Sequence, residues 1–102
     1  MKKRLTQYVI DRVATGVERA LNCTIIADLP EVIMVSDCPA GKHGYYVSGS
    51  DEICIDRRTI SLGAYFRDET LCHELLHWIG IDDENLTHKL DGKCVAYMPR
   101  PA

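Results

Sequence analysis

Apolar residues recur every four positions near the N-terminus, at Leu5, Val9, Val13, Val17 and Leu21. Residues with this spacing share one face of an α-helix, so the segment is predicted to be an amphipathic helix that packs on a core and ends near Asn22. Gly16 lies inside this helix, where it either weakens it or permits another element to approach closely.

Short runs with β-forming residues follow, and we predict strands over residues 23–27, 31–36, 44–49 and 52–56. The sequence SGSD at 48–51 has turn chemistry, so the last two strands should form a hairpin. A second helical pattern begins at residue 61 or 62, and we expect it to bend near residues 67–69 and to end at Gly80.

After Gly80 the chain is polar and then ends in a proline-containing stretch, which predicts an irregular C-terminal tail. The predicted fold is a single α+β domain over residues 1–102. It has an N-terminal helix, a small mixed sheet of about four strands, a second helix and the irregular tail.

Composition narrows the possible partners and location. The formal net charge of −3 leaves no basic surplus for binding nucleic acid, so we expect no nucleic-acid partner. No apolar run is long enough for a signal peptide or a membrane span, so we expect no membrane association. The five cysteines are odd in number and lack CxxC spacing, which disfavours a disulfide framework or a cysteine zinc site. We therefore predict a reduced, cytoplasmic protein, whose oligomeric state the sequence leaves open.

The sequence HELLHWIGIDD at residues 73–83 carries the candidate chemistry. His73 and His77 are four residues apart, so on a helix both can offer imidazole nitrogens to one ion. Glu74 lies too far round the helix to be a comfortable ligand, but it can hold a metal-bound water and act as a general base. The alternative is an ordinary helix with two incidental histidines.

Residues beyond the second histidine favour the metal site. Gly80 can take a positive φ and turn the chain back, and Asp83 three residues later can supply a third ligand. Asp82, Glu84 and His88 remain alternatives for that role because loops can deliver any of them. His43 and Cys38 are weaker candidate ligands in a loop, and we expect Cys72 to pack in the core rather than bind metal.

The pattern H-E-x-x-H-x-x-G-x-x-D resembles that of the metzincin clan of zinc metallopeptidases, and most closely the snapalysin-like members with Asp as third ligand. The resemblance implies one Zn²⁺ per chain, held by His73, His77 and Asp83, and hydrolysis of a peptide or protein substrate with Glu74 as the base. It also implies a methionine turn beneath the metal, which Met98 would provide. The clan's tyrosine two residues after that methionine is replaced by Arg100, and Tyr97 is a candidate substitute.

In the resembling fold an extended peptide pairs with an edge strand beside the zinc-binding helix. Residues 44–49 are the candidate strand, and Tyr45 or Tyr46 would face the cleft as substrate-binding residues.

A second resemblance is to the YbeY-like metal-dependent endoribonucleases, with the pattern H-G-x-L-H-L-x-G-x-D-H. The chain matches the first two histidines of that pattern and its leucine, glycine and aspartate, the last three with Leu76, Gly80 and Asp82. Asp83 takes the place of the third histidine, Glu74 departs from the pattern, and the chain lacks a basic surplus. A third alternative is a catalytically inactive, zinc-binding regulatory module. We expect a metalloendopeptidase.

Overall fold

The computed structural model describes residues 3–35, 38 and 42–100. The elements follow in the order β1 (Lys3–Arg4), α1 (Gln7–Leu21), β2 (Glu31–Val35), β3 (Gly44–Tyr46), β4 (Glu52–Asp56), α2 (Arg57–Ser61), α3 (Ala64–Trp78) and α4 (Glu84–Tyr97). The strands form one mixed sheet in the order β1-β2-β4-β3. The α+β prediction is confirmed.

The sheet contains the predicted hairpin. Strand β3 pairs antiparallel with β4, placing Tyr45 opposite Cys54, and Gly49 takes a φ of 85° in the connecting turn. Strand β2 lies parallel to β4 on its other side. Strand β3 is therefore an edge strand, as expected.

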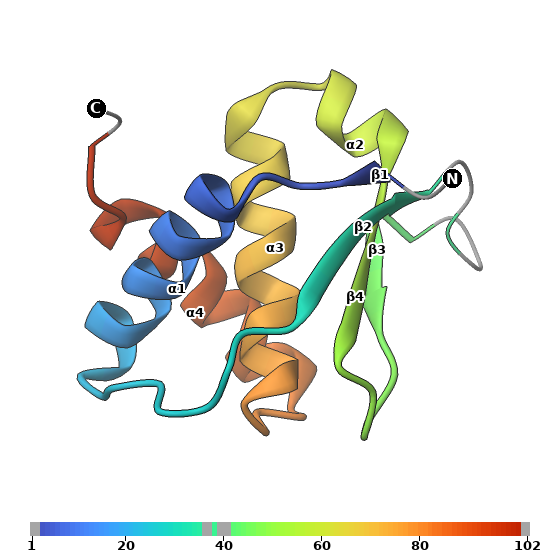
Figure 1. Cartoon of the computed structure of the whole chain (residues 1–102). Coiled ribbons are helices and arrows are strands. Elements are labelled where there is room, and N and C mark those ends of the chain that lie inside the picture. Colours follow the sequence, from blue (N-terminus) through green and yellow to red (C-terminus); the bar gives the residue numbers. More distant parts are fainter. Residues whose placement is uncertain (1–2, 36–37, 39–41, 101–102) are drawn as a thin grey trace.

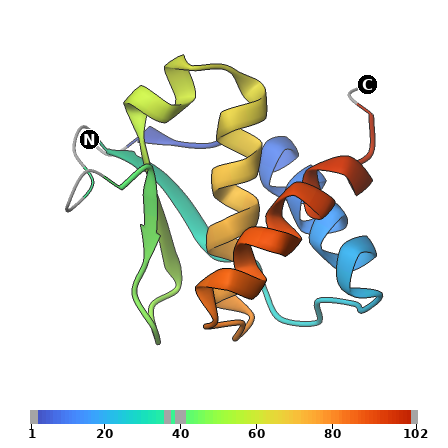
Figure 2. The ribbon, with the colours of Figure 1, turned by 180° about the vertical axis from the view of Figure 1, so that it is seen from behind.

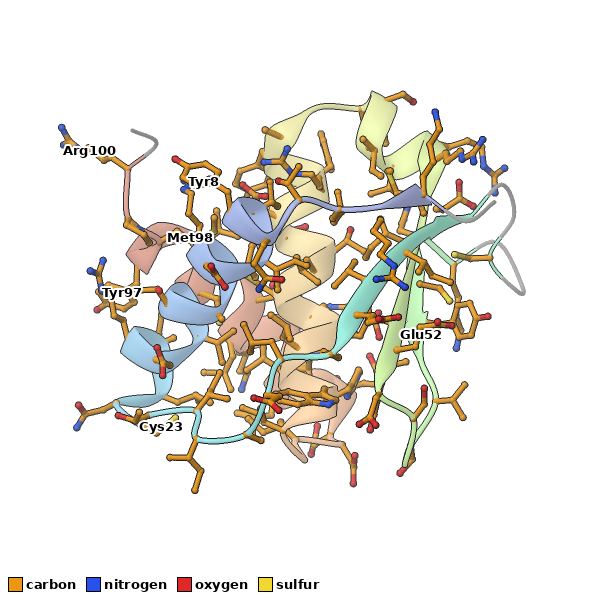
Figure 3. The ribbon with its side chains drawn as sticks, viewed as in Figure 1. Tyr8, Cys23, Glu52, Tyr97, Met98 and Arg100 are labelled. Carbon is orange, nitrogen blue, oxygen red and sulfur yellow. The ribbon has the colours of Figure 1, made fainter. Side chains whose placement is uncertain are left out.

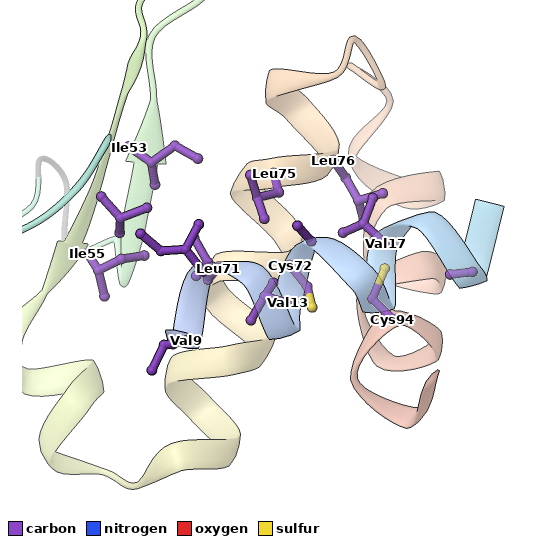
Figure 4. Close-up of a cluster of buried hydrophobic side chains, with 14 residues drawn as sticks. Val9, Val13, Val17, Ile53, Ile55, Leu71, Cys72, Leu75, Leu76 and Cys94 are labelled. Carbon is purple, nitrogen blue, oxygen red and sulfur yellow. The ribbon is translucent and has the colours of Figure 1, made fainter. Parts of the chain in front are cut away.

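Three layers build the molecule (Figures 1 and 2). Helix α3 lies between the sheet on one side and helices α1 and α4 on the other. The apolar core runs through all three layers. Figure 4 shows buried side chains of α3 between those of the sheet on one side and those of α1 and α4 on the other. The fully buried members of this core include Val13, Val17, Ile53, Ile55, Leu71, Cys72, Leu75, Leu76 and Cys94. The predicted core position of Cys72 is confirmed.

Helix α1 matches the predicted amphipathic helix and is capped at both ends. The Thr6 hydroxyl caps its N-terminus by accepting from the Val9 N–H, and Asn22 ends it in the left-handed conformation with a φ of 53°. A Cβ atom on Gly16 would lie 2.5 Å from the carbonyl oxygen of Cys94. Gly16 therefore permits the close approach of α4, which is one of the two roles that the sequence left open.

The strand predicted over residues 23–27 is wrong. The backbone N–H of Cys23 donates to the carbonyl of Glu18, and that of Ile25 donates to the Glu18 carboxylate at 2.7 Å. The segment is thus tied to the end of α1 instead of to a neighbouring strand. Ile26, which a strand would have buried, is 96% exposed.

Two further expectations about the helices need correction. Helix α3 is continuous through residues 67–69, and the interruption lies earlier, at Gly63 with a φ of 122°. The expected irregular tail is largely the 14-residue helix α4, whose N-terminus is capped by Asp83. Within residues 3–35, 38 and 42–100, no helix has the length and apolar character needed to cross a membrane.

Candidate metal centre

His73 and His77 lie one turn apart on α3 and direct their rings at the same point. Their Nε2 atoms are 3.1 Å apart, and about 15% of each side chain is exposed. The two rings meet edge to face, with centroids 4.7 Å apart. The predicted pairing of these two histidines is therefore present in the fold.

Glu84 brings a carboxylate to both rings from the first turn of α4. Its Oε1 atom lies 2.8 Å from His77 Nε2, and its Oε2 atom lies 3.2 Å from His73 Nε2. The path of the chain explains this position, because α3 ends at Trp78 with Ile79 as its C-cap, Gly80 turns with a φ of 109°, and α4 starts directly after Asp83. One carboxylate and two imidazoles thus converge from two helices.

The opposite ring nitrogen of each histidine is already engaged. His77 Nδ1 lies 2.7 Å from the carbonyl oxygen of Ile81, and His73 Nδ1 lies 3.3 Å from a carboxylate oxygen of Asp91. A carbonyl and an ionised carboxylate only accept hydrogen bonds, so each Nδ1 carries the hydrogen. When the rings are neutral, both Nε2 atoms hold lone pairs, and these face each other and the oxygens of the Glu84 carboxylate.

This arrangement fits a bound cation. Two Nε2 lone pairs 3.1 Å apart, with carboxylate oxygens of Glu84 at 2.8 and 3.2 Å, repel one another unless protons on the Nε2 atoms or a metal ion lie among them. Nitrogen ligands about 2.0–2.1 Å from a tetrahedral zinc ion stand about 3.3 Å apart, close to the observed separation. Hydrogen bonding of the second ring nitrogen to a carboxylate or a carbonyl is also the usual outer contact of metal-binding histidines. The residues present therefore fit a zinc ion.

Glu74 lies next to His73 on α3 and is buried, with 6% of its surface exposed. Burial raises the pKa of its carboxyl group, and the nearby His73 and His77 act in the opposite direction. A buried carboxylate with a raised pKa accepts a proton more readily than an exposed one. This is the property that a general base needs.

A cleft of about 520 Å³ opens beside the histidines. Its walls are formed by Lys42, His43, Glu69, Thr70, His73, Glu84, His88 and Asp91. Strand β3 can reach this wall because Gly44 has no side chain, and a Cβ there would lie 2.9 Å from the Thr70 methyl group. His43 precedes that glycine, and its Nδ1 lies 2.9 Å from the hydroxyl of the buried Thr59.

Asp83, the predicted third ligand, has a different position. Its side chain caps α4 by accepting from the backbone N–H of Leu86 at 3.1 Å. His73 and Glu84 also form a group with His88, in which one potential ligand atom of each residue lies within 4.8 Å of the other two. Glu84 and His88 are two of the alternatives that the sequence left open, whereas Asp82 is exposed in the connecting turn.

Met98 and Tyr97 lie far from the histidines. They end α4 beside α1 (Figure 3), about 20 Å along the helix axis from Glu84. Met98 packs at Gly16 instead of forming a turn beneath the metal site, and Tyr97 is 47% exposed with the Lys93 ammonium over its ring. The Met98 prediction fails because the segment before it is a helix, and that helix also removes Tyr97 from the cleft.

The remaining candidates lie outside the cleft lining found among the described residues. Tyr45 faces Cys54 across the sheet, and the Tyr46 hydroxyl accepts from the Gly49 N–H at 3.2 Å. Burial, with help from Asp56, raises the pKa of the Cys38 thiol to about 11. That thiol stays protonated at neutral pH, which makes it a poor metal ligand.

Sequence reasoning missed Asp91, which contacts His73 from α4. The signal was available, because Glu84, His88 and Asp91 follow the i, i+4, i+7 spacing of one helical face. It was hidden by the prediction of an irregular tail. Glu69 and Thr70 were also missed, although they lie one turn before His73 on α3 and helical spacing places them beside it. Lys42 was missed because only the fold brings it to the cleft.

Comparisons with family models, with curated proteins and with solved structures find no match for this chain. Its function is therefore argued from the geometry of the site.

Proposed function

We propose that the chain is a zinc-dependent metallopeptidase in which His73, His77 and Glu84 hold the metal. The observation that carries this proposal is the convergence of both Nε2 atoms and the Glu84 carboxylate, while each Nδ1 atom contacts an acceptor on the other side of its ring. Two imidazoles and one carboxylate are a zinc ligand set known from catalytic sites, where a fourth position stays open. Asp83 is replaced by Glu84 in this ligand set because Asp83 is engaged as a helix cap.

The proposed reaction is hydrolysis of a peptide bond. A bound zinc ion supplies an acidified water and polarises the carbonyl group of the substrate. Glu74 accepts the proton of that water and later passes it to the leaving amine, a role supported by its burial and raised pKa. Asp91 and the Ile81 carbonyl hold the two imidazoles in the orientation that metal binding requires.

Ribonuclease activity is less well supported. The cleft is lined by three carboxylates, Glu69, Glu84 and Asp91, against one lysine, Lys42, and the whole chain carries a net negative charge. A polyanion would be repelled from such a cleft unless bound metal offset that charge. We also propose a cytoplasmic location, which the five free thiols support because oxidising compartments favour disulfides.

Zinc binding is the first test. Purified protein should bind one zinc ion, and a variant with both His73→Ala and His77→Ala should bind none. Replacing Glu84 by Ala should weaken zinc binding by more than the ~10–100-fold that loss of an outer contact costs. The matched control is Asp83→Asn, which keeps the helix cap and should leave zinc affinity unchanged. Weaker binding in the control and unchanged binding in Glu84→Ala would reverse the assignment.

Hydrolysis is the second test. Glu74→Gln keeps the size of the side chain and removes the base, so zinc binding should persist while peptide cleavage falls by ~100-fold or more. A peptide library with varied sequences provides the substrates. If zinc-loaded protein cleaves no peptide but degrades RNA, the endoribonuclease alternative replaces the peptidase proposal.

A further inference from the structure

His88 lies one helical turn after Glu84 and completes a group of three imidazoles around the Glu84 carboxylate. Its Nε2 atom is 3.6 Å from Glu84 Oε2, and its ring centroid is 4.8 Å from that of His73. The closest atoms of His73, Glu84 and His88 that can bind a metal all lie within 4.8 Å of one another. His88 is thus placed within reach of the ion that His73 and Glu84 would hold.

Asp91 faces His88 and His73 at once. One of its carboxylate oxygens lies 3.3 Å from His73 Nδ1 and 3.6 Å from His88 Nδ1, and its side chain is largely buried. This carboxylate attracts the Nδ1 side of both rings, so Nε2 is the atom that each ring offers toward Glu84. Asp91 therefore orients both the buried His73 and the exposed His88 so that each presents its Nε2 atom toward Glu84.

His88 differs from His73 and His77 in how firmly it is held. Both of its contacts, at 3.6 Å, are longer than hydrogen bonds, and 68% of its side chain is exposed. The side chains of His73 and His77 are only about 15% exposed. A largely exposed ring can change rotamer without opening a cavity in the core, whereas the other two rings cannot.

We propose that His88 is a displaceable fourth zinc ligand that closes the metal site. With His88 bound, the tetrahedral set of three imidazoles and one carboxylate is complete, and no position is left for water or substrate. With His88 swung into solvent, the fourth position is open. This inference rests on the proposed metal site and concerns its regulation. His88, one helical turn after Glu84, acts as an intramolecular inhibitor of that site.

The ligand role is tested with Co²⁺ in place of zinc, on the full chain. A His88→Cys variant should show a new sulfur-to-cobalt charge-transfer band in the near ultraviolet. The matched control is His43→Cys, which has the same number of cysteines and alters another histidine of the cleft. The control should show no such band. In addition, His88→Ala should weaken zinc affinity by less than Glu84→Ala does, because His88 is the displaceable ligand, and should alter the visible cobalt spectrum.

The outcomes separate this inference from the proposed function. A new band in His88→Cys, with weaker zinc binding in His88→Ala, supports the ligand role whether or not any peptide is cleaved. Faster peptide hydrolysis by His88→Ala than by the natural chain adds the inhibitory role. Absence of the band and unchanged zinc affinity overturn the inference even if the natural chain is an active peptidase. Loss of cobalt binding in His73→Ala, together with no effect in either His88 variant, would support the metal site and exclude His88 from it.

Discussion

The two halves of α4 perform different tasks in the same helix. Its first two turns present Glu84 and Asp91 to the histidines of α3, and the hydroxyl of the fully buried Thr87 donates to the carbonyl of Asp83 at 2.7 Å. Its last turns bury Cys94 in the core and bring the backbone against Gly16 of α1. The first half is polar on its inner face, and the second half is packed like an ordinary core helix.

This difference shows how a small domain can hold a precise site. The C-terminal half is anchored to α1, where Arg12 donates to the Pro99 carbonyl at 2.8 Å and Arg19 to the Tyr97 carbonyl at 3.0 Å. A rigid helix transmits that anchoring to Glu84 and Asp91 at its other end. Sites on packed helices are held more precisely than sites on loops, so the packed half supports the geometry of the polar half.

The largest expected effect comes from breaking the packed half. Gly16→Ala places a Cβ 2.5 Å from a backbone carbonyl oxygen that cannot move aside, so the free energy of unfolding should fall by ~2–3 kcal/mol. The same substitution at Gly92 is the control, because a Cβ there meets no atom of the described residues within 4 Å. Gly92→Ala should instead raise stability by ~0.5–1 kcal/mol. Urea unfolding measures both, and equal effects at the two glycines would contradict this packing.

Asp91→Asn should weaken the polar half without harming the packed half. The amide keeps the size of the carboxylate but loses the charge that holds His73 Nδ1, so zinc affinity should fall ~10–100-fold. Competition with a chelator measures the affinity, and Asp83→Asn is again the matched control. Unchanged zinc affinity in Asp91→Asn would remove Asp91 from the site.

Zinc binding should stabilise the first half of α4 more than the second half. An ion held by His73, His77 and Glu84 links the start of α4 to α3, so local opening of residues 84–91 should become rarer by about tenfold or more in excess zinc. Amide hydrogen exchange should slow there and change little over residues 92–97. The Glu84→Ala variant should lose the slowing, and uniform slowing along α4 would mean that zinc acts on global stability only.

The same contrast explains what could be predicted from the sequence. Helix α1 carries its apolar residues with an unbroken period and has clear caps, so its extent was predicted closely. Helix α4 was missed because its buried face includes Thr87 and Asp91, which interrupt the apolar period. Asp91 contacts His73, and the Thr87 hydroxyl lies 3.5 Å from the Ile81 carbonyl that His77 also contacts. The polar residues that hid the helix therefore belong to the candidate site or support it.

The part of the site that lies within a single helix was predictable from the sequence. His73, Glu74 and His77 belong to one helix, and their spacing alone fixes their relative placement. The third ligand depends on where the next helix begins, and a shift of one residue decides between Asp83 and Glu84. Aspartate is among the preferred N-cap residues, and this rule could have assigned Asp83 to the cap. His43 and Lys42 reach the cleft only through the packing of β3 on α3.

The smallest expected effect concerns the residue that starts the polar half. Asp83→Ala removes the carboxylate that accepts from the Leu86 N–H, so the free energy of unfolding should fall by ~1 kcal/mol. Asp83→Asn should stay within about 0.5 kcal/mol of the natural chain, because asparagine caps helices nearly as well. If Asp83 were instead a zinc ligand, both variants would lose zinc affinity, and the loss would exceed any change in stability. Unfolding in the presence of a chelator, compared with zinc titration of the same two variants, distinguishes a cap from a ligand.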